Sequence, residues 1–155
     1  MKVWKTALLL VAVLVAAAVI LGPGWLENWN TQRAEEAKQY QRQGEQYGRT
    51  VDTQQCMDTA LNNLQGCVGN TCTINQGVFL KACLTVATPN PVLCEGIPPF
   101  RNKMLDKEKE WARYFCTDKG IVHDGCRFLL RRQQSFCAGG VPADTVAEGS
   151  DTDQP

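Results

Sequence analysis

The sequence predicts an all-α protein, with an N-terminal transmembrane helix and a small disulfide-stapled domain of two helical hairpins. Three observations lead to this prediction. A long uncharged apolar segment lies near the N-terminus of the 155-residue chain, and all eight cysteines lie between Cys56 and Cys137. No long run alternates between apolar and polar residues, the pattern that would indicate a β-strand. Dense cysteines in so short a region are typical of a disulfide scaffold in an oxidising compartment.

Residues 1–26 are expected to form a transmembrane signal-anchor. Residues 6–26 carry no charged side chain, and as a helix rising about 1.5 Å per residue they would span about 31 Å, close to the bilayer core of about 30 Å. A helix is the form in which such a segment satisfies its backbone inside hydrocarbon. Trp4 and Trp25 stand near its ends, where indole rings favour the membrane interface. We therefore expect contact with the lipid bilayer through residues 4–25.

The charges next to this segment predict its orientation. Lys2 and Lys5 precede it, so the positive-inside rule keeps the N-terminus in the cytoplasm and exports the rest. This predicts a single-pass protein of the bacterial inner membrane with a periplasmic C-terminal domain, where the cysteines can form disulfides. The alternative is a signal peptide cleaved at residues 16–18 or 22–24, which leaves a secreted or periplasmic protein.

Residues 27–52 are predicted to form a juxtamembrane helical stalk. The segment is polar, rich in helix formers, and carries a weak apolar stripe of Ala34, Ala37, Tyr40 and Tyr47. Gly44 and Gly48 weaken the prediction in its C-terminal half, because glycine disfavours helix by about 1 kcal/mol. A solvated spacer is the alternative interpretation.

Residues 53–140 are predicted to form the stapled domain. Its first hairpin has an apolar stripe from Val51 to Cys67, a break at Gly69-Asn70 and a second helix from Thr73 to Val86. In the second hairpin, the first helix is expected to run from about Phe100 to Cys116 and to stop at Gly120. The second helix is expected to start with Asp124 as its cap and to end at Cys137. Residues 141–155 contain four acids, no base and no aromatic residue, and are expected to be disordered.

The cysteine spacing predicts which cysteines pair. Three pairs are eleven residues apart (56 and 67, 72 and 83, 126 and 137), which places both members on one helix face but about 16 Å apart, beyond the roughly 7 Å limit of a disulfide. Each helix therefore needs an antiparallel partner that carries matching cysteines. The preferred connectivity is Cys56–Cys83, Cys67–Cys72, Cys94–Cys137 and Cys116–Cys126, and exchanges at Cys83 and Cys94 remain open.

This layout resembles, over Cys56 to Cys83, the twin Cys-x9-Cys helical hairpins of mitochondrial intermembrane-space proteins. The spacing here has ten intervening residues in place of nine. The resemblance is one of stapling geometry and implies no function, but it keeps a mitochondrial location as a minor alternative.

The sequence lacks the residue patterns of common catalytic sites, so we expect no enzymatic activity, cofactor or metal. It has no Cys-x-x-Cys and no Gly-x-Ser-x-Gly, and its one histidine, His123, lies in an expected loop. Asp106, Glu108 and Glu110 alternate with lysines, as on a solvated helix face. An enzyme would need a pocket that gathers Glu95, Asp118, His123 and Asp124. Phe100, which follows Pro98-Pro99, is a candidate exposed contact.

Three arginines are the candidate contacts for an anion or a partner: Arg127, Arg131 and Arg132. Arg127 and Arg131 lie four residues apart on one helix face, so they repel unless an acid or an anionic partner is near. A solvated basic face is the simpler alternative. The chain as a whole has no net charge, which argues against nucleic acid as a partner. Residues 100–137, however, hold nine bases and five acids, and the acidic C-terminal residues follow them directly.

These observations favour a non-enzymatic binding or assembly module in the cell envelope, which presents a rigid helical surface to an unidentified envelope protein. The alternative is a secreted, soluble, disulfide-rich effector or inhibitor. The four bridges are expected to be necessary for folding, because a domain this small buries a modest core.

Overall fold

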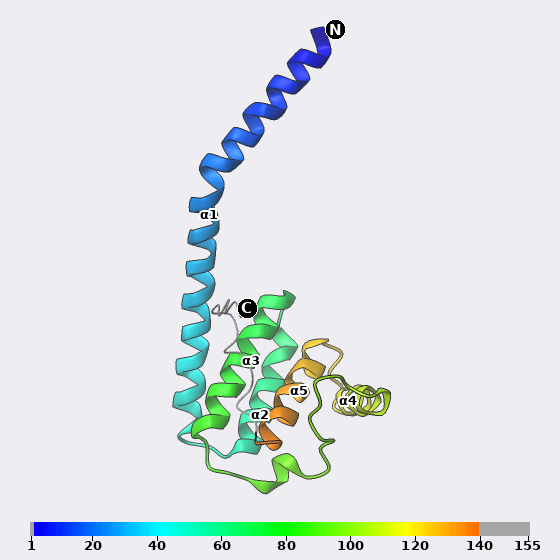
Figure 1. The fold of residues 1–155 in the computed structure, drawn as a ribbon. Coiled ribbons are helices and arrows are strands. Elements are labelled where there is room, and N and C mark those ends of the chain that lie inside the picture. The colour runs from blue at the N-terminus through cyan, green and yellow to red at the C-terminus, as the bar shows by residue number, and fades with distance from the viewer. Residues whose placement is uncertain (1, 140–155) are drawn as a thin grey trace, which may run out of the picture. The chain divides into compact units, whose positions relative to one another are not determined.

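The structure, a computed structural model, describes residues 2–139; within them, the side chains of residues 2, 3, 5, 6, 8, 9 and 18–23 are outside the description. Every regular element in this range is a helix, and a single bridge between Asp52 and Thr88 is the extended pairing found there. The all-α prediction is therefore confirmed for this range (Figure 1). The expected disordered tail, residues 141–155, lies outside the described residues.

The chain divides into two compact units between Lys38 and Gln39, inside the long helix α1 (Lys2–Gly48). In the first unit the side chains of Trp4 and Trp25 are exposed. Among the described residues, no helix is both long and apolar enough to cross a membrane. Several residues of the expected membrane segment have side chains outside the description, and the structure does not confirm the transmembrane helix.

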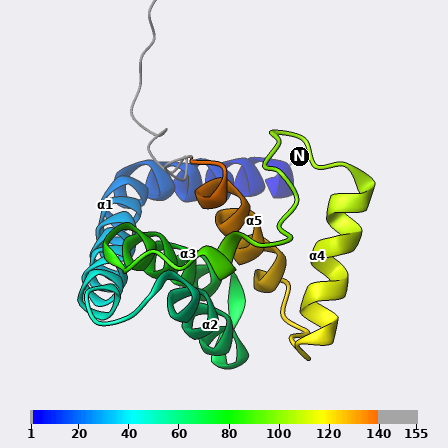
Figure 2. The ribbon, with the colours of Figure 1, turned by 90° about the horizontal axis from the view of Figure 1, so that it is seen from below.

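The second unit contains the disulfide-bonded helices. After α1 come α2 (Thr53–Asn63), the 3-10 helix η1 (Leu64–Gly66), α3 (Gly69–Val86), the 3-10 helix η2 (Pro91–Cys94), α4 (Asp106–Asp118) and α5 (Gly125–Cys137). Helices α2 and α3 form the first hairpin, and α4 and α5 form the second. Because α5 packs on both α2 and α3, the two hairpins share one core, with α5 between α3 and α4 (Figure 2).

The core consists mainly of apolar side chains from α2, α3 and α5, together with Leu64 of η1, Leu93 of η2, and Ala112 and Cys116 of α4. Its largest fully buried members are Met57, Leu64, Leu80, Leu93, Leu129 and Leu130. Their removal from water is the main non-covalent stabilisation, at about 1.5–3 kcal/mol for each large apolar side chain.

The compact unit starts at Gln39, whereas the sequence places the start of the stapled domain at residue 53. Tyr40 and Tyr47, near the C-terminal end of α1, pack against the core, and the Thr59 hydroxyl donates to Tyr47 Oη at 2.9 Å. Gly44 and Gly48 face α3 so closely that a Cβ would lie 2.3 Å from the Phe79 carbonyl oxygen and 2.5 Å from that of Cys83, respectively. These glycines permit helix packing there.

Two expected helix starts are wrong. Helix α4 begins at Asp106 rather than near Phe100, because residues 100–105 form a loop held to α5. Helix α3 begins at Gly69 rather than at Thr73, so Gly69-Asn70 belongs to the helix and is not a break before it. Asp124 stands at the N-cap of α5, as expected, but its side chain accepts no capping hydrogen bond; the Gly125 amide donates instead to His123 Nδ1 at 2.9 Å. The expected stop of α4 is found, since Gly120 has φ +67° and the amide of Ile121 donates back to the Cys116 carbonyl at 2.8 Å.

Candidate functional site

Four disulfide bonds hold the helices together, and they leave no free cysteine. They join Cys56 to Cys83, Cys67 to Cys72, Cys94 to Cys137, and Cys116 to Cys126. These are the four pairs preferred from the spacing. Each hairpin thus has one bridge at its turn and one at or near its open end.

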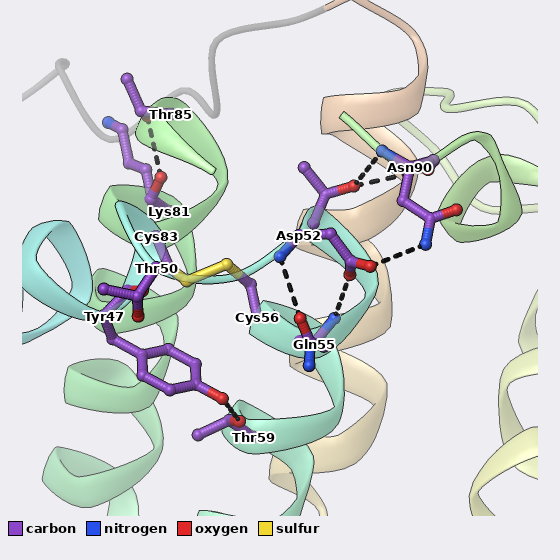
Figure 3. The surroundings of a disulfide bond; sticks show 11 residues. Tyr47, Thr50, Asp52, Gln55, Cys56, Thr59, Lys81, Cys83, Thr85 and Asn90 are labelled. Carbon is purple, nitrogen blue, oxygen red and sulfur yellow. Dashed lines mark hydrogen bonds between the residues drawn. A yellow bond between two sulfur atoms is a disulfide. The ribbon is translucent and has the colours of Figure 1, made fainter. Parts of the chain in front are cut away.

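The bridge between Cys56 and Cys83 closes the open end of the first hairpin inside the core, where both residues are fully buried. Next to it, Asp52 caps α2: its Oδ1 accepts from the Gln55 amide at 2.9 Å, and Gln55 Oε1 accepts from the Asp52 amide at 3.1 Å (Figure 3). Asn90, which follows α3, donates its side-chain amide to Asp52 Oδ2 at 3.0 Å. This end of the hairpin is therefore bonded covalently and through polar contacts.

Those contacts change the acidity of Asp52. Hydrogen bonds from the Gln55 backbone, and secondarily from the Asn90 side chain, favour the carboxylate and lower the pKa of Asp52 below its ordinary value of 3.8. The pKa of Asp106, at the start of α4, is also lowered, by the hydrogen bond and the charge of Lys109. Both shifts arise from contacts at the starts of helices.

Each hairpin also has a short bridge at its turn. Cys67–Cys72 spans five residues between α2 and α3, and Cys116–Cys126 spans ten between α4 and α5. The second turn lies against the first hairpin: a Cβ on Gly125 would meet Leu64 Cδ2 and Thr73 Cγ2 at 2.9 Å. The two turns are therefore neighbours.

A groove of about 640 Å³ lies between them, and we call it the turn groove. Its lining includes Thr73 and Ile74 of α3, Val122 and His123 of the second turn, and Phe128 of α5. Ile74 is 55% exposed and Val122 is 99% exposed, and Val68, in the first turn, is 92% exposed. Ile74 and Val122 are exposed apolar side chains in the groove wall, and Val68 lies on the neighbouring turn, so this groove is the strongest candidate binding surface.

The turn groove contains two of the four polar residues that an enzyme pocket here would gather. His123 and Asp124 line it, and both also line a second groove of about 440 Å³ between α4 and α5. Glu95 and Asp118 line neither. His123 accepts the Gly125 amide, and Asp124 Oδ1 pairs with Arg127 Nη2 at 2.6 Å. These contacts give both residues local structural roles.

The three candidate arginines each have a partner within the chain. Arg127 pairs with Asp124. The Arg132 guanidinium carbon lies 4.8 Å from the centre of the Phe128 ring, a cation–π contact. Arg131 donates to the Arg101 carbonyl and lies 4.0 Å above the Phe100 ring. Arg131 therefore holds the Pro98–Arg101 loop on α5.

Beneath this loop, in the first turn of α4, lies Glu108, which the sequence pattern placed on a solvated face. Glu108 is 1% exposed, not on a solvated face. Its Oε2 accepts from the Leu105 amide at 2.9 Å, and its Oε1 lies 3.2 Å from Arg101 Nε, an ion pair without hydrogen-bond geometry. Phe100, the candidate exposed contact, is half-buried beneath Arg131.

Sequence reasoning did not identify the turn groove, although a signal was present. Val68 precedes Gly69, and Val122 follows the helix-ending Gly120, so both are apolar residues in turns where polar residues predominate. Neither residue belongs to a helical stripe, which is why the periodicity passes over them.

Within the described residues, no group of three histidine, cysteine or acidic side chains is placed to hold a metal ion. Compared with protein-family models, curated proteins and solved structures, the chain has no significant match.

Proposed function

We propose that this protein is a membrane-anchored, exported binding or assembly module of the cell envelope, without enzymatic activity, and that its turn groove receives a segment of another protein. The observation that carries the proposal is the exposure of Val68 and Val122 on turns closed by disulfides. Within the groove itself Ile74 and Val122 are both exposed. Exposed apolar side chains gathered on a rigid scaffold are typical of protein interaction sites, because little order is lost on binding.

The anchor and the location rest on the sequence. The uncharged residues 6–26 follow Lys2 and Lys5, an arrangement that favours a cytoplasmic N-terminus and an exported domain in the bacterial inner membrane. Four disulfides support an oxidising compartment such as the periplasm.

Site-specific photo-crosslinking in cells tests the binding surface. A photoreactive residue at Val122 or Val68 should give the same discrete cross-linked protein, and one at Tyr114 of α4, which is also well exposed, should not. Val122→Asp should abolish the cross-link from position 68 while leaving the four disulfides intact. Equal cross-linking from all three positions, or none from the turns, would contradict the proposal.

The second candidate is a secreted effector or inhibitor, favoured by the small residues at 16–18 and 22–24 where a signal peptidase could cut. The mass of the N-terminal peptide separates the two candidates. A chain that retains residues 1–26 and stays with the membrane fraction supports the anchor. A mature N-terminus near Val19 or Trp25 supports secretion.

A further inference from the structure

A second cleft lies away from the turn groove, and we call it the basic cleft. It has a volume of about 280 Å³ and is lined by Pro98, Pro99, Arg101, Lys107 and Glu108. One wall is the loop before α4, and the other is the first turn of α4. This volume is slightly below the range of small-molecule sites, which starts at about 300 Å³, and suits one or two side chains of a peptide.

Contacts with α5 hold the cleft in place. Gln134 Nε2 donates to the Pro98 carbonyl at 3.2 Å, and Arg131 donates to the Arg101 carbonyl. On the α4 side, the buried Glu108 reaches Arg101 Nε. The cleft is therefore preformed and needs no ligand for its shape.

The cleft carries an excess of positive charge. Arg101, with a side chain 54% exposed, is balanced by Glu108. Lys107 is exposed, and within the described part of the chain no carboxylate pairs with it. A carboxylate that enters the cleft would thus meet Lys107, whose charge is not balanced by an acid, and the exposed part of the Arg101 guanidinium.

The other basic groove of this hairpin is less suited to an anion. Arg113 and Arg127 line the 440 Å³ groove between α4 and α5. Glu110 Oε1 lies 4.0 Å from Arg113, and Asp124 lies 2.6 Å from Arg127. Two cations with two acids leave no excess charge there.

The acidic C-terminal residues follow α5, the helix that holds the loop of the basic cleft. Near the end of α5, Gln134 donates a hydrogen bond to Pro98. Cys137 forms a disulfide with Cys94, in the segment that leads to the cleft. Beyond Gly139 the chain contains Asp144, Glu148, Asp151 and Asp153 and no base. Arg131, which contacts Arg101 of the cleft, lies eight positions before Gly139, or about 12 Å along the helix. The 14 residues from Gly139 to Asp153 reach at most about 50 Å when extended, so the segment is long enough to bring a carboxylate back to the cleft.

We propose that the acidic C-terminal segment, residues 140–155, docks in the basic cleft, with a carboxylate between Lys107 and Arg101. Charge complementarity and the length of the acidic segment beyond α5 support this occupant. The interaction is independent of the turn groove, so the function proposed above stands or falls separately.

Hydrogen exchange measured by mass spectrometry on the full chain in detergent micelles tests the proposal. The test variant neutralises the segment at constant length: Asp144→Asn, Glu148→Gln, Asp151→Asn and Asp153→Asn. Amide exchange at residues 100–107 should become at least about threefold faster than in the wild type, because the local opening free energy falls when the segment detaches. Raising the salt from about 0.1 M to about 1 M should have the same effect on the wild type, since the Debye length falls from about 10 Å to about 3 Å.

Lys107→Glu supplies the specificity test. In this background, neutralising the segment should leave exchange at residues 100–107 unchanged. In the matched Lys119→Glu background, at the opposite end of α4, the threefold effect should persist. The proposal is overturned if neutralisation never alters residues 100–107, if the effect survives Lys107→Glu, or if it appears around Arg113 and Arg127 instead.

Discussion

At the scale of single residues, burial determines which charged groups matter to the fold. Arg127 and Arg131 lie four positions apart on α5, yet Arg127 forms an exposed ion pair, and Arg131 holds the Pro98–Arg101 loop through a carbonyl and an aromatic ring. Glu108 is buried beneath the same loop. Charge pattern along a helix therefore does not predict these roles.

Arg131→Ala is expected to destabilise the protein more than Arg127→Ala. The Arg131 guanidinium makes a charged hydrogen bond and a cation–π contact, together about 1–3 kcal/mol, whereas an exposed ion pair such as that of Arg127 contributes about 0–1 kcal/mol. Denaturant unfolding of both variants measures the difference. Equal losses would show that the loop contact adds nothing.

Asp52 predicts a stability change in acid. Its pKa is lowered in the folded protein, mainly by the Gln55 amide, so the unfolded state binds more protons between the folded and unfolded pKa values. The stabilisation is complete above about pH 4 and is lost as the pH falls through the lowered pKa. Asp106 contributes in the same direction through Lys109.

The measurement is the free energy of unfolding between about pH 5 and about pH 2. Asp52→Asn keeps a side chain that can cap α2 but does not titrate, so its stability should fall less steeply with acid than that of the wild type. Parallel curves for Asp52→Asn and the wild type would contradict the assignment.

At the scale of elements, the contact between the end of α1 and α3 depends on Gly44 and Gly48. They are one helical turn apart, so both face the same neighbour. A residue type that disfavours an isolated helix here allows two helices to approach closely. The sequence alone shows the cost of these glycines, and the reason for them becomes visible only with α3 in place.

Gly44→Ala is expected to destabilise the protein by about 1–3 kcal/mol, because its Cβ would overlap the Phe79 carbonyl oxygen. Helix propensity alone predicts the opposite, a gain of about 1 kcal/mol. Thermal unfolding followed by circular dichroism measures the outcome. Gly66→Ala is the control, since no atom lies within 4 Å of its added Cβ; a stabilised Gly44→Ala would contradict the close packing.

At the scale of the whole molecule, the four disulfides supplement one shared core. Core contacts hold the second turn against the first hairpin, whereas no disulfide joins α4 or its turn directly to α2 or α3. The bridge from Cys94 to Cys137 attaches the connecting segment to the end of α5. The rigidity of the turn groove therefore depends on packing as well as on covalent bonds.

Removal of single bridges should rank with the length of the loop that each closes. Cys94→Ala with Cys137→Ala opens a 43-residue separation and should cost about 4 kcal/mol, whereas Cys67→Ala with Cys72→Ala opens five residues and should cost about 2 kcal/mol. Denaturant unfolding of the two double variants tests the order. If full reduction of the wild type leaves its helical circular dichroism and melting temperature unchanged, the scaffold interpretation is wrong.

The sequence by itself determined the helical class, the disulfide scaffold and the four preferred pairs. These follow from local rules, because the helical repeat places cysteines eleven residues apart on one face and glycine ends helices through positive φ, as at Gly120. The burial of Glu108, the role of Arg131, the packing of Gly44 and the meeting of the two turns depend on residues distant in the chain. Only the tertiary structure decided them, because no local pattern specifies which surface a helix face will meet.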